Sequence, residues 1–300
     1  MEGYMHEIPE YRKPFGSAHN SASGGSQTVD EHVLKLYLRK ELGRSFPFAA
    51  RPRAGQIVQS IADMALGVHD YSPISGPTKP VDMEDAVRRG MNEFEFYKPR
   101  DWDDGKDAEE YHKFKEIIPE MANHAVAGIK EFYGDTEFEG EFQRWHQDEL
   151  IDVPTMLFQD YTGGGRQIDL KCSFPTRNPL KKDGTRSWRF PKPKTEPTPQ
   201  QILQQAVYWK ATGDAPGLLF VTPLGYNIVD ASNCDALKPD ALEDAYQQVR
   251  QRWLVIQNLL RAANGSWSNL FALVQPDYGQ IVGRHGPEIL AIAKQDWRLD

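Results

Sequence analysis

One stretch near the middle of the chain, residues 148–173, constrains the fold more than any other. It reads as two short apolar segments separated by three consecutive glycines, DELIDVPTMLFQDYTGGGRQIDLKCS. Apolar runs of this length on either side of a Gly-rich turn are typical of β-strands. The sequence therefore predicts strands over residues 153–161 and 166–173, joined at Gly163–Gly165.

The second of these strands carries an acid and a lysine on one face. Side chains alternate along a strand, so Asp169 and Lys171 project to the same side, while Leu170 and its alternate neighbours point into a core. An acid and a lysine that emerge together from an apolar strand cost solvation free energy unless something compensates them. A divalent metal ion with a polarised water would provide that compensation. Asp152, at the start of the first strand, is a further candidate acid.

These residues resemble the active-site motif of the PD-(D/E)XK nucleases, in the pattern Asp152 … Asp169-Leu170-Lys171. The resemblance implies that Asp152, Asp169 and the carbonyl of Leu170 hold one or two Mg²⁺ or Mn²⁺ ions. It implies that Lys171 orients and helps to activate the attacking water, while the metal polarises the phosphodiester and stabilises the leaving oxygen.

A second motif places the chain near one branch of that superfamily. Gln204 and Tyr208 match the Q-x-x-x-Y element of the RecB-like exonucleases, and this spacing occurs once in the chain, after the strand that carries Lys171. The two side chains are one helical turn apart and share a face. By resemblance, they hydrogen-bond the scissile strand or orient Lys171. The similarity covers about residues 54–230.

A helix expected over residues 54–66 resembles the first motif of the same branch. That motif is usually G-x-x-x-H, with a histidine that reaches the metal, and here Gly55 is followed by Gln59 in the place of the histidine. An amide oxygen can ligate a hard cation, although it is a poorer ligand than imidazole for transition metals. Gln59 is therefore a candidate metal ligand. The alternative is that residues 55–59 are simply part of an amphipathic helix.

Basic and aromatic residues gather in residues 174–199, directly after the strand that carries the proposed site. Basic side chains interleaved with aromatic ones suit a phosphate backbone and unstacked bases. The alternative is a solvated surface loop. The candidate nucleic-acid contacts are Arg177, Lys181, Lys182, Arg186, Trp188, Arg189 and Lys192.

Charge and cysteine content limit the class of protein. A net charge of −8 argues against a protein that coats nucleic acid over its whole surface, but not against an enzyme with one basic groove. The chain has two cysteines, Cys172 and Cys234, which suit a reducing cytoplasm and are too few for the four-cysteine iron–sulfur cluster of some related nucleases. Residues 1–28 lack the apolar core of a signal peptide, and no apolar run is long enough to span a membrane.

The expected architecture is α/β, with a restriction-endonuclease-like core in which a central mixed sheet is flanked by helices. Residues 1–28 are expected to form a flexible, Gly/Ser-rich arm. Residues 29–135 form a helical region that carries the first motif, and residues 136–300 form the nuclease core with C-terminal helices, the two packing as one domain. A strand is expected over residues 136–145 and a short helix near residues 287–295.

The interpretation that follows is a metal-dependent DNA exonuclease that hydrolyses phosphodiester bonds from single-stranded or frayed DNA ends. The resemblance is greatest to small phage-encoded nucleases of DNA degradation or recombination, which implies host cytoplasm, and a homo-oligomer or a recombination partner fits this role. Two alternatives remain at this point. One is a DNA-binding or assembly module with a decayed nuclease site, because Gln59 replaces the usual histidine. The other is a structure-specific endonuclease.

Overall fold

The computed structural model describes residues 7–40, 49–68, 80–99, 105–140, 142–181, 186–274 and 291. The helices are η1 (Glu10–Phe15), α1 (Ala22–Gly25), α2 (Val29–Lys40), α3 (Ala50–Leu66), α4 (Met83–Glu95), α5 (Lys106–Tyr133), α6 (Pro199–Thr212), η2 (Asp235–Leu237), α7 (Pro239–Ala263) and α8 (Trp267–Leu273). The strands are β1 (Asn20–Ser21), β2 (Phe142–His146), β3 (Thr155–Gln159), β4 (Tyr161–Gly163), β5 (Arg166–Cys172), β6 (Thr176–Arg177), β7 (Trp188–Arg189), β8 (Ala215–Thr222) and β9 (Gly225–Asp230).

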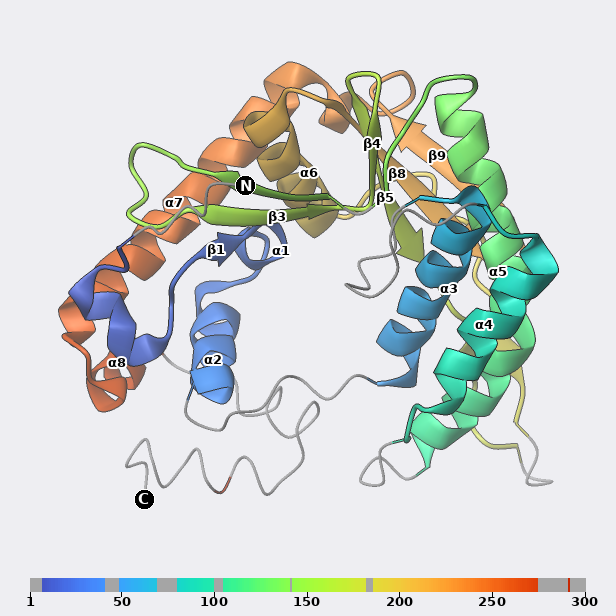
Figure 1. Cartoon of the computed structure of the whole chain (residues 1–300). Helices are drawn as coiled ribbons and strands as arrows, with labels where there is room; N and C mark the ends of the chain where they lie inside the picture. The colour runs from blue at the N-terminus through green and yellow to red at the C-terminus, as the bar shows by residue number, and fades with distance from the viewer. Residues whose placement is uncertain are drawn as a thin grey trace.

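A mixed sheet in the order β4-β5-β8-β9 lies at the centre of the fold. β5 pairs antiparallel with β4 and parallel with β8, and β8 pairs antiparallel with β9. Figure 1 shows α3, α4 and α5 together on one side of this sheet, with α6 and α7 on the other. The chain is therefore an α/β protein with helices on both faces of a mixed sheet.

Alternation along β8 produces a separate core on each face of the sheet. Leu218 and Phe220 pack with residues of α2, α6, α7 and α8, while Leu219 and Val221 pack with residues of α3, α4 and α5. Both sets are buried, as expected for a strand covered by helices on both sides. Leu170 of β5 packs against the second core, as its strand alternation predicts.

A smaller sheet, in the order β1-β3-β2, leads directly into the central one. The sequence predicts one strand over residues 153–161, and the structure divides it. β3 ends at Gln159 in the smaller sheet, and β4 begins at Tyr161 in the central sheet. Asp160 occupies the corner between them. The expected strand over residues 136–145 is also shorter, because β2 begins at Phe142.

The N-terminal segment corrects the expectation of a flexible arm over residues 1–28. Among the described residues of this segment, β1 pairs in parallel with β3, and Phe15 and Arg12 are fully buried. Ser21 caps α1 by accepting a hydrogen bond from the N–H of Gly24 at 3.0 Å. Residues 7–28 are thus built into the fold through contacts with distant parts of the chain.

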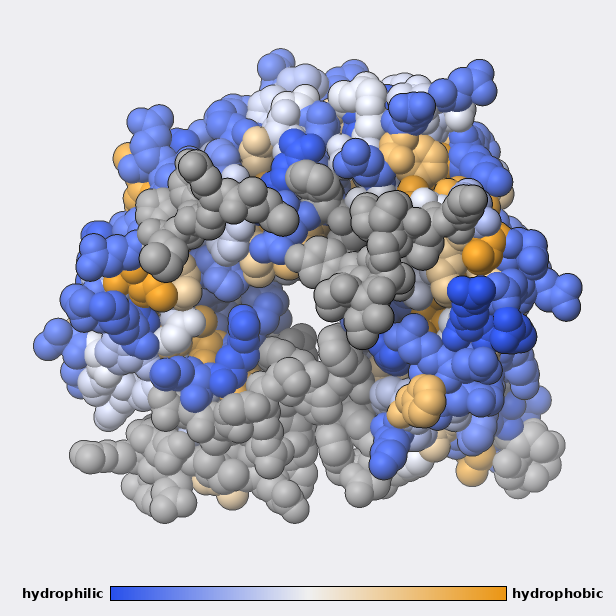
Figure 2. Space-filling view, viewed as in Figure 1, coloured by the Kyte–Doolittle hydropathy of each residue, from blue (hydrophilic) through white to orange (hydrophobic). Residues whose placement is uncertain are grey.

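The helix expected over residues 54–66 is present as part of α3, and α5 continues through Pro119 without a break. The helix expected near residues 287–295 lies outside the described residues, apart from position 291. None of the helices in the described part of the chain is long and apolar enough to cross a membrane. On the face in Figure 2, apolar residues form small separate patches among hydrophilic ones.

Candidate active site

Two carboxylates, Asp160 and Asp169, meet at one side of the central sheet. The β4–β5 turn has positive φ at Gly164 (58°) and Gly165 (71°), the backbone of a tight hairpin turn that glycine adopts without steric cost. This turn pairs Tyr161 with Ile168, so the next position along brings Asp160 toward Asp169. Both side chains line one cavity of about 280 Å³.

β4 pairs with β5 only as far as Ile168, and Asp160 lies beside the edge of β5 that continues beyond this residue. The backbone N–H of Leu170 donates a hydrogen bond to Oδ2 of Asp160 at 2.7 Å. The N–H and C=O of one strand residue point to the same edge, so the carbonyl of Leu170 is directed to the side of Asp160 as well. The site therefore has oxygen atoms from two carboxylates and one backbone carbonyl on one edge.

Lys171 is held by a chain of polar contacts that begins at its ammonium group. Lys171 forms an ion pair with Asp169 and donates a hydrogen bond to Oε1 of Gln204 at 3.2 Å. Gln204 Nε2 donates to the hydroxyl of Tyr208 at 3.1 Å, and that hydroxyl donates to the carbonyl of Phe158 at 2.6 Å. The position of the lysine is thus fixed from β3 through two side chains of α6.

α6 carries strong sequence determinants at both ends, which set the register of Gln204 and Tyr208. Thr198 and Gln201 form a capping box, in which each side chain accepts from the other residue's backbone N–H, and Pro199 opens the helix. The left-handed backbone of Gly213 ends it. Gln204 and Tyr208 share one face, as their spacing predicts, and that face meets β5.

Gln59 of α3 lines the same cavity as Asp160, Asp169 and Lys171. It is on the helix that the first-motif resemblance selects, and the structure brings it to the other sequence-predicted residues. Ser21 and Ser23 of the N-terminal segment form another wall. The expectation of a flexible arm excluded them from the site.

The electrostatics of the cavity reflect two buried acids beside one base. Burial, and then the neighbouring charge of Asp169, raise the pKa of Asp160 well above its usual value. For Lys171, burial lowers the pKa, but the carboxylates of Asp169 and Asp160 outweigh this effect and raise it. The side chain of Asp169 is 7% exposed. An ammonium and a pair of close carboxylates therefore share a site with little solvent.

Asp152 does not join this cavity, which corrects its expected role as a metal ligand. Its carboxylate forms an ion pair with the fully buried Arg12 at 2.8 Å and lies 3.5 Å from Arg261, and its backbone N–H donates to Gln257 at 3.0 Å. The acid serves to compensate a buried guanidinium, whose pKa is lowered to about 10 chiefly by burial. Asp160 lies where the sequence interpretation placed Asp152.

The residues expected to bind nucleic acid differ in their exposure and in whether they already form ion pairs. Arg177 and Arg186 both form ion pairs with Glu109 of α5, at 3.0 and 3.2 Å, so one carboxylate offsets part of the charge of both. Among the remaining candidates, Lys182 lies outside the described residues. Trp188 is half-buried, and the exposed ones are Lys181, Arg189 and Lys192.

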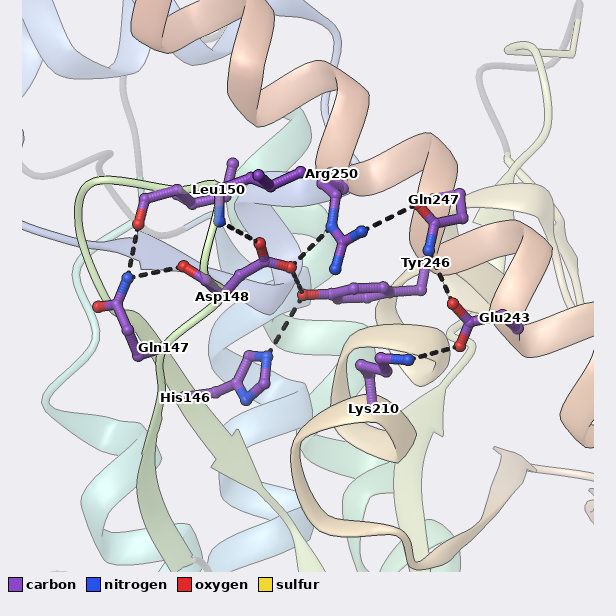
Figure 3. A network of polar contacts seen from close by, with 10 residues as sticks. His146, Gln147, Asp148, Leu150, Lys210, Glu243, Tyr246, Gln247 and Arg250 are labelled. Atoms are coloured by element: carbon purple, nitrogen blue, oxygen red, sulfur yellow. Dashed lines mark hydrogen bonds and ion pairs between the residues drawn. The ribbon is translucent and has the colours of Figure 1, made fainter.

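A polar network away from the cavity anchors the smaller sheet to α7 (Figure 3). Asp148 accepts hydrogen bonds from the Tyr246 hydroxyl at 2.5 Å, Arg250 Nε at 2.8 Å and the N–H of Leu150 at 2.9 Å. Burial tends to raise the pKa of Asp148, and these hydrogen bonds reverse that effect and lower it. The network holds the loop between β2 and β3, and thereby the strand that delivers Asp160.

Sequence reasoning missed Asp160, although the chain contains a feature that identifies it. The three glycines fix a tight turn, and counting outward from that turn places Asp160 opposite Asp169. The same count leaves Asp152 far along the other strand. The hairpin register, rather than the beginning of the apolar run, locates the second acid.

Comparison with known proteins does not assign the chain to a family: no family model matches it, and neither does any curated protein or solved structure.

Proposed function

We propose that this chain is a metal-dependent DNA exonuclease of the PD-(D/E)XK type, with a restriction-endonuclease-like core. One observation carries the proposal. Asp160, Asp169 and Lys171, with Gln204 and Tyr208 from α6, surround a single cavity although they come from separate elements. Two acids, a lysine and the Q-x-x-x-Y pair in one place match the donor set that this class of nuclease requires.

The donor set fits Mg²⁺ or Mn²⁺. The described residues contain no group of three or more His, Cys, Asp or Glu side chains that would hold a metal. Mg²⁺, however, keeps several waters and is commonly held by one or two carboxylates together with substrate phosphates. Asp160, Asp169, the Leu170 carbonyl and the Gln59 amide oxygen are hard oxygen donors of this kind. Burial, and then the charge of Asp169, raise the pKa of Asp160, and a bound cation would favour the ionised carboxylate against both effects.

Each residue then has a defined role. Asp160 and Asp169 would hold the cation, which would supply Lewis-acid polarisation of the phosphodiester. Lys171 holds the attacking water and stabilises negative charge on the phosphate. Gln204 and Tyr208 keep the ammonium of Lys171 in position, through the contacts at 3.2 and 3.1 Å. The low exposure of the Asp169 side chain, 7%, strengthens its electrostatic interactions.

The direct test is hydrolysis of end-labelled single-stranded DNA by the purified chain with Mg²⁺ or Mn²⁺, with a chelator control. We expect the linear strand to become progressively shorter from one end, and we expect no cleavage of closed circular single-stranded DNA. Lys171→Ala should lose the activity and remain folded. Cleavage of the circle would instead indicate an endonuclease. No metal-dependent cleavage of either substrate would contradict the proposal.

A further inference from the structure

A second cavity adjoins the candidate active site. It encloses about 340 Å³ and shares Gln59, Leu170 and Lys171 with the first cavity, of about 280 Å³. The two cavities are therefore adjacent, and Gln59, Leu170 and Lys171 lie at their common boundary. Each volume is near the lower end of the range for small-ligand sites, roughly 300–1,000 Å³. Each cavity has room for one small unit.

The second cavity has two polar side chains with unused donors. Lys194 is exposed and forms no ion pair with any residue that the structure describes. Gln201 uses its Oε1 to accept from the N–H of Thr198 at 2.8 Å, while its NH₂ group has no acceptor in the described part of the chain. Both can donate to an anion without breaking an existing contact.

Besides Lys171 and Lys194, this cavity has one further cationic residue, Arg51, and its guanidinium is already hydrogen-bonded. Its guanidinium donates to the carbonyls of Phe174 and Pro175, both at 2.9 Å, and to Glu110 at 3.0 Å. These bonds tie α3 and α5 to the segment that leaves β5, and they leave Arg51 as part of the wall. Anion binding in the cavity therefore falls to Lys194 and Gln201.

Part of the wall of this cavity is apolar. It includes Pro52, Gly55 and Cys172. A Cβ added at Gly55 would have Cys172 Cβ as its nearest neighbour, at 4.0 Å, so the glycine leaves this wall open toward the strand. An apolar wall and two free donors in one cavity suit a ligand with a flat ring and an attached phosphate.

We propose that this cavity is a nucleotide subsite, which binds the nucleotide adjacent to the scissile phosphate of a single DNA strand. Lys194 and the amide N–H of Gln201 contact its phosphate oxygens, and its base lies on the apolar wall. The cavity, of about 340 Å³, is near the lower end of small-ligand sites, so it suits one unpaired nucleotide rather than a base pair. The inference rests on the proposed function and adds the path of the substrate beyond the reacting atoms.

The test measures binding, so that it does not depend on turnover. Labelled single-stranded oligothymidylates of increasing length are titrated with the protein in Ca²⁺ buffer, and anisotropy gives Kd at each length. We expect Kd for wild type to fall about tenfold at the length that first fills both cavities, the effect of one charge-assisted contact. Lys194→Ala and Gln201→Glu should lose this step. Glu at 201 can still accept from Thr198, which preserves the helix cap.

Two matched variants control for charge and for helix stability. Gln200→Glu makes the same charge change one residue away, at an exposed position outside both cavities, and Lys130→Ala removes an exposed lysine at the end of α5. Both should keep the step. An identical step in all five proteins, or no step in wild type, would overturn the subsite.

The outcome is separable from the proposed function. A step in Kd without hydrolysis in Mg²⁺ or Mn²⁺ would support the subsite and contradict the nuclease activity. Hydrolysis without a step would support the nuclease and contradict the subsite.

Discussion

The backbone N–H of Leu170 donates a hydrogen bond to Asp160 Oδ2 at 2.7 Å, across the open edge of β5. Leu170 lies between the acid and the lysine of the D-x-K motif, so this bond joins the corner after β3 to the motif itself. The two carboxylates are thereby positioned by backbone geometry. Preorganisation of this kind lowers the cost of arranging ligands when a cation binds.

Tyr208→Phe tests the chain of contacts that positions Lys171. The change removes the hydroxyl that accepts from Gln204 and donates to the Phe158 carbonyl. Because Tyr208 acts on Lys171 through Gln204, we expect kcat to fall about tenfold, with little change in KM. A tenfold change is the scale of one lost hydrogen bond in a network that includes a charged group. Tyr226→Phe, which removes a hydroxyl bonded to Glu131, is the matched control. A loss confined to KM would show that Tyr208 binds substrate instead.

The salt dependence of DNA binding tests which basic residues of 174–199 contact phosphate groups. Lys181→Ala and Arg189→Ala should each reduce the log–log salt slope by about 0.7, the value for one phosphate contact on a single strand. Arg177→Ala and Arg186→Ala should each reduce the slope by less, because the two guanidinium groups share the carboxylate of Glu109. Equal reductions in all four variants would mean that DNA displaces Glu109.

Metal titration tests Gln59, which lines both cavities. Gln59→Ala should weaken metal affinity modestly, since one neutral ligand among carboxylates contributes a minor share. Gln59→His should retain activity and shift preference from Mg²⁺ toward Mn²⁺, because imidazole favours softer ions. The measurement is cleavage rate against concentration of each metal. Superimposable curves for the three proteins would exclude Gln59 from the metal site.

The burial of His32 in α2 predicts that the free energy of unfolding decreases at acidic pH. Burial, followed by the charges of Lys35 and Arg12, lowers the pKa of His32 to about 4. The unfolded chain takes up this proton near pH 6.5, whereas the folded one does so only near 4. This contribution to stability is therefore complete above pH 6.5 and is lost as pH falls toward 4, by on the order of 3 kcal/mol.

His32→Gln should remove this part of the acid sensitivity, measured as the free energy of unfolding in urea between those two pH values. His112→Gln, at an exposed position of α5, is the matched control. If the pH profile of His32→Gln has the same slope as wild type, another group is responsible.

Local sequence patterns predicted the elements that depend on local interactions. The turn at Gly163–Gly165 and the strand with Asp169 and Lys171 lie where their patterns indicate. These features are determined by backbone preferences and by residues within one or two turns. The same patterns predicted that Gln204 and Tyr208 share a face.

Contacts between distant residues could not be predicted in this way. Asp152 pairs with Arg12, 140 residues away, and nothing in either local sequence indicates this pair. Likewise Glu109 compensates Arg177 across 68 residues. Asp160 was missed for a different reason. Residues 153–161 read as one continuous strand in the sequence, whereas the chain changes from one sheet to the other at Asp160.

The central claim is that Asp160, and not Asp152, is the second acid of the site, and parallel rate measurements on two variants test it most directly. Asp160→Asn keeps the volume and removes the ligand charge, and each 1.36 kcal/mol of lost transition-state stabilisation is a factor of ten. We expect its rate of metal-dependent DNA hydrolysis to fall at least ~100-fold, as several kcal/mol of metal stabilisation are lost, with its Tm near that of wild type. Asp152→Asn leaves the buried Arg12 uncompensated, so its Tm should fall, while the folded protein keeps a rate close to wild type. Loss of hydrolysis in folded Asp152→Asn, with full activity in Asp160→Asn, would contradict the account.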